Sequence, residues 1–322
     1  MSFITNIRSV AKYESKILVR SWFFRIFTLL AVVFLGFFNF AMMLMEDNFG
    51  LWFAKSVSSN IPYLNLLLLN TGQAVVAVFL SSEFLKRDKK LDTSEVFYVR
   101  PLSNAEYVVG KIWGNLRVFL FLNLLVLAIV LAFNFMASGV TVDLPAYLIY
   151  FFLISIPTLI FIIGLSIFLM LLLKNQALTF ILLLGYIGLT LFYIQDKFYY
   201  LFDYMVYNLP LFKSTIVGFS NLELILNHRA IYFFAGLGFI FFTIFLFKRL
   251  PNARRSHYPW LFLSFCMFLL MGTAGFRHVR SILREGEMRA LYTSINNKYV
   301  YEPKMAIDYY DISVEQKSET IR

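Results

Sequence analysis

Charge and cysteine are both scarce in this 322-residue sequence. Charged residues make up 15% of the chain, against about a quarter in soluble domains, which excludes an ordinary water-soluble fold. The single cysteine, Cys266, lies in an apolar segment. A disulfide or a cysteine metal site within the chain is therefore excluded.

The sequence also lacks the motifs of two enzyme classes. It has no Gly-x-x-x-x-Gly-Lys-Ser/Thr stretch to cradle phosphates; Gly110 and Lys111 come nearest, but Ile112 follows them. It has no His-Glu-x-x-His motif to hold zinc. We therefore expect that the chain is not itself an ATPase and binds no cofactor or metal of its own. We also expect separate, interfacial positions for its three scattered histidines: His228, His257 and His278.

Hydrophobic residues, by contrast, make up 60% of the sequence. They gather in segments long enough to cross about 30 Å of hydrocarbon, which predicts an all-α polytopic membrane protein. The fourth segment contains Pro157 and Gly164, so we expect a tilt or kink there. Seven spans are predicted, at residues 24–45, 62–84, 116–137, 145–173, 177–194, 230–247 and 259–276.

The net charge of +10 sits in short basic runs beside the apolar segments, which favours a membrane over nucleic acid as the partner. Alternate loops carry these runs, so we expect those loops and the N-terminus to be cytoplasmic. With seven spans the C-terminus is then external, although Arg277, Arg280 and Arg284 follow the last span. The loops predicted to be cytoplasmic contain Arg8, Lys12, Lys16 and Arg20; residues 86–115; Lys174; and Lys248, Arg249, Arg254 and Arg255.

Residues 1–22 predict an amphipathic helix. Arg8, Lys12, Lys16 and Arg20 recur every four residues and form one basic stripe. Such a stripe contacts anionic lipid at the membrane surface. The helix is either a simple topology anchor or an elbow helix that lies flat before the first span of an exporter.

The loop "KRDKKLDTSEVFYVRPLSNAEYVVGKIWGN", residues 86–115, carries two helix-start signals. Asp92 or Thr93 can cap a short helix that ends before Pro101, and Ser103 with Glu106 forms a capping box that starts the third span. The short helix carries apolar side chains in a polar loop. These either rest on lipid headgroups or fill a groove on a soluble motor protein: Val96, Phe97 and Val99.

This loop resembles the cytoplasmic loop after the second span of type-2 ATP-binding-cassette (ABC) exporter permeases. The sequence departs from that pattern at Asp92, where glycine is common, and at Ser94. The residues that carry the resemblance are Arg87, Asp88, Thr93, Glu95, Arg100, Pro101, Gly110 and Lys111.

The resemblance implies a six-span permease domain over residues 23–250. Its outer segment, 195–229, is expected to form re-entrant or interfacial helices, or else an aromatic belt at the lipid surface. Residues 251–284 would add a seventh span. Residues 285–322 would form an external tail or the first part of a soluble, aminopeptidase-like domain, in which Tyr310–Ile312 begins a strand.

The resemblance further implies a permease subunit of an exporter in the bacterial inner membrane, paired with a second permease. ATP and Mg would bind to separate ABC ATPase subunits. Glu95 and Arg100 would make polar contacts with the ATPase, and Val96 and Phe97 would fill its groove.

Two other interpretations stay open: an ion-coupled secondary carrier, and a membrane anchor for an external domain. Against the carrier, we find no ionisable residue at the centre of a predicted span. The strongly polar residues there are amides, which we expect to join helices by hydrogen bonds: Asn39, Asn65, Asn70, Gln73, Asn123 and Asn134.

Overall fold

The computed structural model describes residues 3–44, 58–82, 102–136, 142–194, 197–209, 211, 213–214, 218–219, 221–247, 258–302, 309 and 311. The regular elements in these ranges are helices, beside a single antiparallel bridge between Ser214 and Gly218. Seven helical stretches in these ranges are long and apolar enough to cross a membrane. The prediction of an all-α polytopic membrane protein is confirmed.

The helices begin and end close to the predicted spans in most cases. In chain order they are α1 (Phe3–Arg20), α2 (Trp22–Leu44), α4 (Asn60–Ser82), α7 (Asn104–Met136), α8 (Leu144–Tyr150), η1 (Phe151–Ser155), α9 (Ile156–Leu173), α10 (Gln176–Leu189), η2 (Thr190–Ile194), η3 (Phe198–Tyr200), α11 (Leu222–Leu246) and α12 (Tyr258–Lys298). The helices at the third, sixth and seventh predicted spans, α7, α11 and α12, are longer than predicted.

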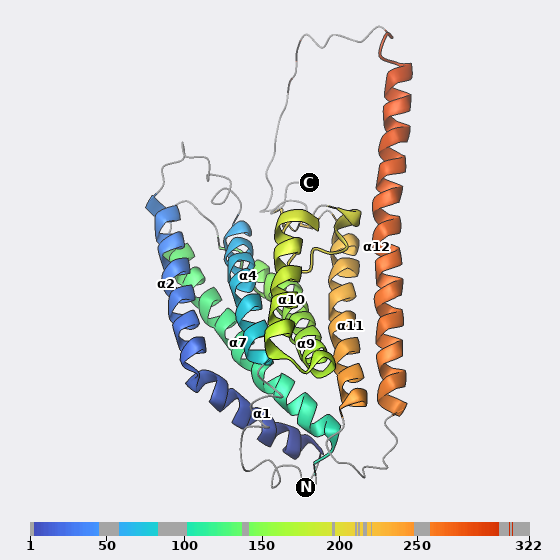
Figure 1. Ribbon diagram of the computed structural model, residues 1–322. Helices are drawn as coiled ribbons and strands as arrows, with labels where there is room; N and C mark the ends of the chain where they lie inside the picture. The colour runs from blue at the N-terminus through green and yellow to red at the C-terminus, as the bar shows by residue number, and fades with distance from the viewer. Residues whose placement is uncertain are drawn as a thin grey trace. The chain divides into compact units, whose positions relative to one another are not determined.

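The chain divides into two compact units, Met1–Arg280 and Ser281–Arg322. In the first unit successive long helices alternate in direction (Figure 1). One end of this bundle, the α1 end, carries α1, Ser103, Lys174 and Phe247. The opposite end, the turn end, carries residues 197–209, 211, 213–214 and 218–219. The second unit is helical as far as Lys298.

The α9–α11 pair forms the tightest part of the bundle. A Cβ added to Gly164 would lie 2.7 Å from the carbonyl oxygen of Gly236, and one added to Gly236 would lie 2.7 Å from the backbone of Ile160. Small residues at a helix crossing allow such close backbone approach in a membrane. A π-helical turn, η1, precedes α9, and such turns are one cause of helix kinks.

Amide side chains join the helices inside the bundle, as predicted. Asn39 on α2 and Asn65 on α4 exchange two hydrogen bonds, of 2.7 and 3.1 Å. Asn123 on α7 donates to Gln73 at 2.8 Å and accepts from Ser155 at 2.8 Å. Each bond satisfies a polar group that would find no water to bond within the hydrocarbon of a membrane.

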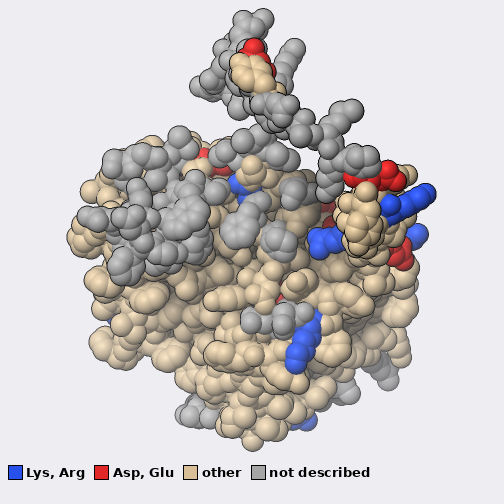
Figure 2. All heavy atoms as spheres, turned by 90° about the horizontal axis from the view of Figure 1, so that it is seen from above, with Lys and Arg blue, Asp and Glu red and all other residues tan. Residues whose placement is uncertain are grey.

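Seen from the turn end, most of the described surface is uncharged, with few Lys, Arg, Asp and Glu side chains (Figure 2). Large apolar side chains are exposed along α2 and α10 and in the turn after α10, among them Phe37, Phe40, Ile181 and Phe192. A surface of this composition suits lipid.

Candidate functional site

The predicted motor-contacting residues lie outside the described residues: Arg87, Asp88, Thr93, Glu95, Val96, Phe97, Arg100 and Pro101. The structure does describe the chain from Leu102 to Met136. Glu106 accepts a 2.6 Å hydrogen bond from the backbone N–H of Ser103, and the hydroxyl of Ser103 accepts one of 3.2 Å from the N–H of Glu106. The predicted capping box at the start of α7 is therefore confirmed.

The first turns of α7 pack along α1, and we call α1 with Asn104–Arg117 the clamp. Gly110 and Gly114 lie at this contact. A Cβ on Gly110 would meet the Cβ of Val10 at 2.7 Å, and a Cβ on Gly114 would meet the carbonyl oxygen of Ala11 at 2.9 Å. Only glycine allows the two helices to approach this closely.

Polar contacts reinforce the clamp on both sides of the glycines. Arg117 donates to the carbonyl of Ala11 at 2.9 Å, and Ser15 donates to the carbonyl of Gly114 at 2.6 Å. The buried Lys111 ammonium and Glu14 carboxylate lie 4.0 Å apart. Truncating one member of a buried charge pair leaves the other uncompensated, so these groups fix the position of α1.

The clamp leaves the predicted basic stripe free to face outward. Arg8, Lys12, Lys16 and Arg20 are all exposed, whereas Ala11 and Leu18 are buried. The foot of α7 also contacts the end of α11, since Asn104 donates to the carbonyl of Phe247 at 2.5 Å and the rings of Tyr107 and Phe247 stack. The clamp thus carries the basic stripe on its surface and contacts the end of α11.

The turn end contains a buried arginine that the predicted spans did not include. Arg229 lies in α11, one residue before the predicted start of the sixth span at residue 230. Its guanidinium donates to the carbonyls of Leu153 and Tyr204, at 2.6 and 2.9 Å, and to the hydroxyl of Thr158 at 2.8 Å. Pro157 has no N–H to offer the carbonyl of Leu153, so Arg229 supplies the donor that the proline removes.

Asp203 lies beside this arginine in the turn segment. Its carboxylate oxygens accept hydrogen bonds from the backbone N–H groups of Tyr207 and Asn208, at 2.9 and 2.8 Å. Burial raises the pKa of the Asp203 carboxyl above its ordinary value. The two backbone hydrogen bonds and the charge of Arg229 oppose that rise without cancelling it.

The expected helices of segment 195–229 are short here. Before α11, the described residues form one three-residue helical turn, η3, followed by turns and the bridge at Ser214. The backbone of Phe198, Tyr199 and Tyr200 is left-handed, with φ of 51°, 59° and 62°. Such a conformation costs an L-residue about 1–2 kcal/mol, so this segment needs support from its neighbours.

The expectation for the histidines is wrong for two of them. His228 on α11 and His278 on α12 are both fully buried, and their ring centroids lie 5.1 Å apart. They come together because α11 and α12 run side by side at the turn end, which a separation of fifty positions along the chain does not reveal (Figure 1). His257 lies outside the described residues.

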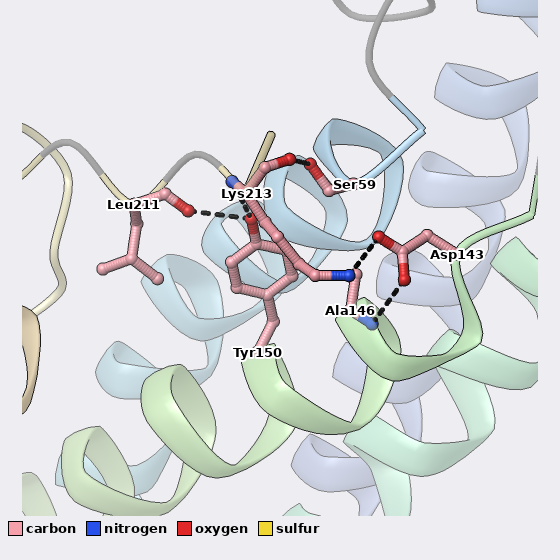
Figure 3. A network of polar contacts seen from close by, with 6 residues as sticks. All are labelled: Ser59, Asp143, Ala146, Tyr150, Leu211 and Lys213. Atoms are coloured by element: carbon pink, nitrogen blue, oxygen red, sulfur yellow. Dashed lines mark hydrogen bonds and ion pairs between the residues drawn. The ribbon is translucent and has the colours of Figure 1, made fainter. Parts of the chain in front are cut away.

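A second polar cluster ties the turn segment to α4 and α8 (Figure 3). The Lys213 ammonium lies 2.5 Å from the carboxylate of Asp143, which also accepts a bond from the N–H of Ala146 and so caps α8. The hydroxyl of Tyr150 donates to the carbonyl of Leu211, and Ser59 donates to that of Lys213. The cluster satisfies backbone groups that the irregular segment leaves unpaired.

Neither a protein-family model nor a curated protein matches this sequence. Function is therefore inferred from the residues and the geometry of the chain itself.

Proposed function

We propose that this chain is the membrane subunit of an ABC exporter of the bacterial inner membrane, driven by a separate ATPase subunit. The observation that carries the proposal is the clamp. The charged loop that resembles a coupling loop leads directly into a capped helix foot, and that foot is fixed to an elbow-like helix with an exposed basic stripe.

The clamp gives that loop a mechanical path into the membrane. Helix α7 runs for 33 residues, or about 50 Å at 1.5 Å per residue, which exceeds the hydrocarbon thickness of about 30 Å. A force on residues 86–101 would reach its start at once, and Asn104 with Tyr107 would pass it to the end of α11. ATP and Mg would bind to the partner subunit, and a second permease would complete the transporter.

The buried Arg229 favours a second candidate, an ion-coupled secondary carrier. Ionisable groups at membrane depth often carry coupling ions. Here, however, the guanidinium is occupied by three carbonyls and a hydroxyl, which is the pattern of a structural group. A carrier predicts substrate uptake into vesicles driven by an ion gradient without ATP.

The test is to purify the tagged chain from its own membrane in mild detergent and to identify stoichiometric partners by mass spectrometry. The exporter predicts a soluble ATPase subunit with a Gly-x-x-x-x-Gly-Lys-Ser/Thr motif. Phe97→Asp should remove it, whereas Tyr301→Asp, at the 95% exposed Tyr301, should retain it. Recovery of the permease without any ATPase, or of equal ATPase with both variants, would contradict the proposal.

A further inference from the structure

The two buried histidines hold adjacent carbonyl groups of the strained turn. His228 Nε2 lies 3.0 Å from the carbonyl oxygen of Tyr200, and His278 Nε2 lies 2.8 Å from that of Tyr199. A carbonyl oxygen only accepts, so each Nε2 must carry a proton and donate it. Two helices thereby hold the left-handed turn Phe198–Tyr200 in place.

The other ring nitrogen of each histidine, Nδ1, is left without a hydrogen bond in the described part of the chain. Among the described residues, neither Nδ1 has a hydrogen-bond partner, and both are buried. With Nε2 protonated, a bare Nδ1 makes each ring neutral. A second proton would place an N–H where no acceptor waits and a charge where water is excluded.

The described titratable groups around the pair leave both Nδ1 atoms without a hydrogen-bond partner. Arg229 adjoins His228 on α11, and Arg277 adjoins His278 on α12. The Tyr232 ring lies 5.3 Å from the ring of His228, and its hydroxyl is already committed to the carbonyl of Leu201. On the turn segment, Asp203 is held by backbone N–H groups. Tyr204, whose hydroxyl is also buried, lies beside Tyr232, with ring centroids 6.3 Å apart.

We propose that His228 and His278 form an acid-sensitive latch, which holds the turn Phe198–Tyr200 against α11 and α12 while both rings are neutral and releases it when they are protonated. The strain of the turn favours release once the two bonds are lost. Loss of the His278 bond would also loosen α12. Among the described residues, two side-chain hydrogen bonds join α12 to the other elements: that of His278 with Tyr199 and that of Ser264 with Gly238.

Low pH favours the released state, because only that state accommodates a second proton on each ring. In the held state each ring donates from Nε2 and, among the described residues, has no acceptor for a second proton on Nδ1. Each ring that gains a proton only on release raises the ratio of released to held molecules by up to about tenfold for each unit by which the pH falls. The latch is independent of the proposed function, because it is a property of the purified chain.

The test measures the distance between spin labels on cysteines placed at the exposed Phe202 and Phe276, in a Cys266→Ser background in nanodiscs. The latch predicts one distance at pH 8 and a second, longer population at pH 5. Glutamine can donate from the position of Nε2 but does not titrate, so His228→Gln/His278→Gln should keep the single distance at pH 5. His257→Gln, the matched control, should behave like the wild type.

A distance distribution that does not change with pH in the wild type would overturn the latch. An unchanged pH response in the double glutamine variant would also overturn it and would point to Asp203. Zn²⁺ that narrows the distances in the wild type, but not in the double variant, would assign the pair to metal binding instead. Hydrogen exchange of residues 197–209 in the unlabelled wild type, corrected for intrinsic pH effects, must rise at pH 5 if the latch exists.

Discussion

The two ends of the bundle are held together by different means. At the α1 end, two regular helices meet backbone to backbone through Gly110 and Gly114. At the turn end, long polar side chains reach out from helices to the carbonyls of an irregular segment, as Arg229 does to Tyr204. Glycine contacts tolerate almost no displacement, whereas side-chain bonds can be exchanged one at a time.

This difference separates two tasks. A rigid clamp suits the end at which we place the ATPase, since a force there has to move helices rather than deform a contact. A segment held by side chains, two of them titratable, suits the end at which a conformational change would open a path. Single substitutions can break one end at a time.

Gly114→Val should produce the largest effect. Its side chain would meet the backbone of Ala11, which cannot move aside as a flexible side chain can. We expect a loss of more than about 3 kcal/mol in the free energy of unfolding, measured by denaturant titration in detergent. Gly188→Val on α10 is the control, because no atom lies within 4 Å of a Cβ there. Equal losses in the two variants would show that the clamp is not tight.

Arg229→Met should come next. It removes the side-chain donor for the buried carbonyl of Leu153 and leaves that of Tyr204 with the hydroxyl of Thr158, at 3.2 Å. We expect a loss of about 2–3 kcal/mol, because relief from burying a charge offsets part of the cost of the orphaned groups. Protease nicking between residues 197 and 219 should accelerate, while the clamp region stays protected. Nicking at both ends alike would mean that the two ends are not separate.

Asp203→Asn should change the shape of the pH profile more than the stability at one pH. Since the folded-state pKa of Asp203 is raised, its contribution is fully present below the ordinary aspartate pKa and is lost as pH rises through the folded-state value. The slope for one proton is at most about 1.4 kcal/mol per pH unit. Thermal unfolding from pH 4 upward should show a flatter profile in this variant. Glu223→Gln, at an exposed position on α11, should keep the wild-type slope.

Lys213→Met should have the smallest effect. The Lys213–Asp143 pair is partly exposed, at 20% and 13% of the two side chains, so water screens it. We expect a loss of about 0.5–1 kcal/mol, which 0.5 M salt should reduce in the wild type but not in the variant. A salt-independent loss would show that the contribution is packing of the lysine stem.

Local patterns allowed the regular parts of the fold to be predicted. Apolar segment length located seven spans, and the Ser103–Glu106 spacing located the start of α7. The amides that hydrocarbon cannot hydrate were expected to pair across helices, and Asn39 and Asn65 do. These predictions succeed because each depends on neighbours in sequence or on the solvent alone.

The missed features depend on distant parts of the chain. Hydropathy placed the start of the sixth span at residue 230 and so left out Arg229. Its burial could not be predicted locally, because the carbonyls that accept its hydrogen bonds lie up to 76 residues earlier, at a proline-interrupted helix. The meeting of His228 with His278 depends on how α11 and α12 pack. The clamp did have a local signal, the four-residue spacing of Gly110 and Gly114, which is typical of close helix contacts in membranes.

The most direct test is whether α1 and the start of α7 move together as one rigid body while the ATPase subunit hydrolyses ATP. Asn6→Cys and Glu106→Cys, in a Cys266→Ser background, place one thiol on each helix where the native side chains share a 2.9 Å hydrogen bond. A short thiol-reactive cross-linker would then join α1 to α7 in the complex purified with its ATPase subunit. We predict that the cross-linked complex hydrolyses ATP at the rate of the uncross-linked one. A large loss of ATP hydrolysis on cross-linking, restored when the linker is cleaved, would contradict a rigid clamp.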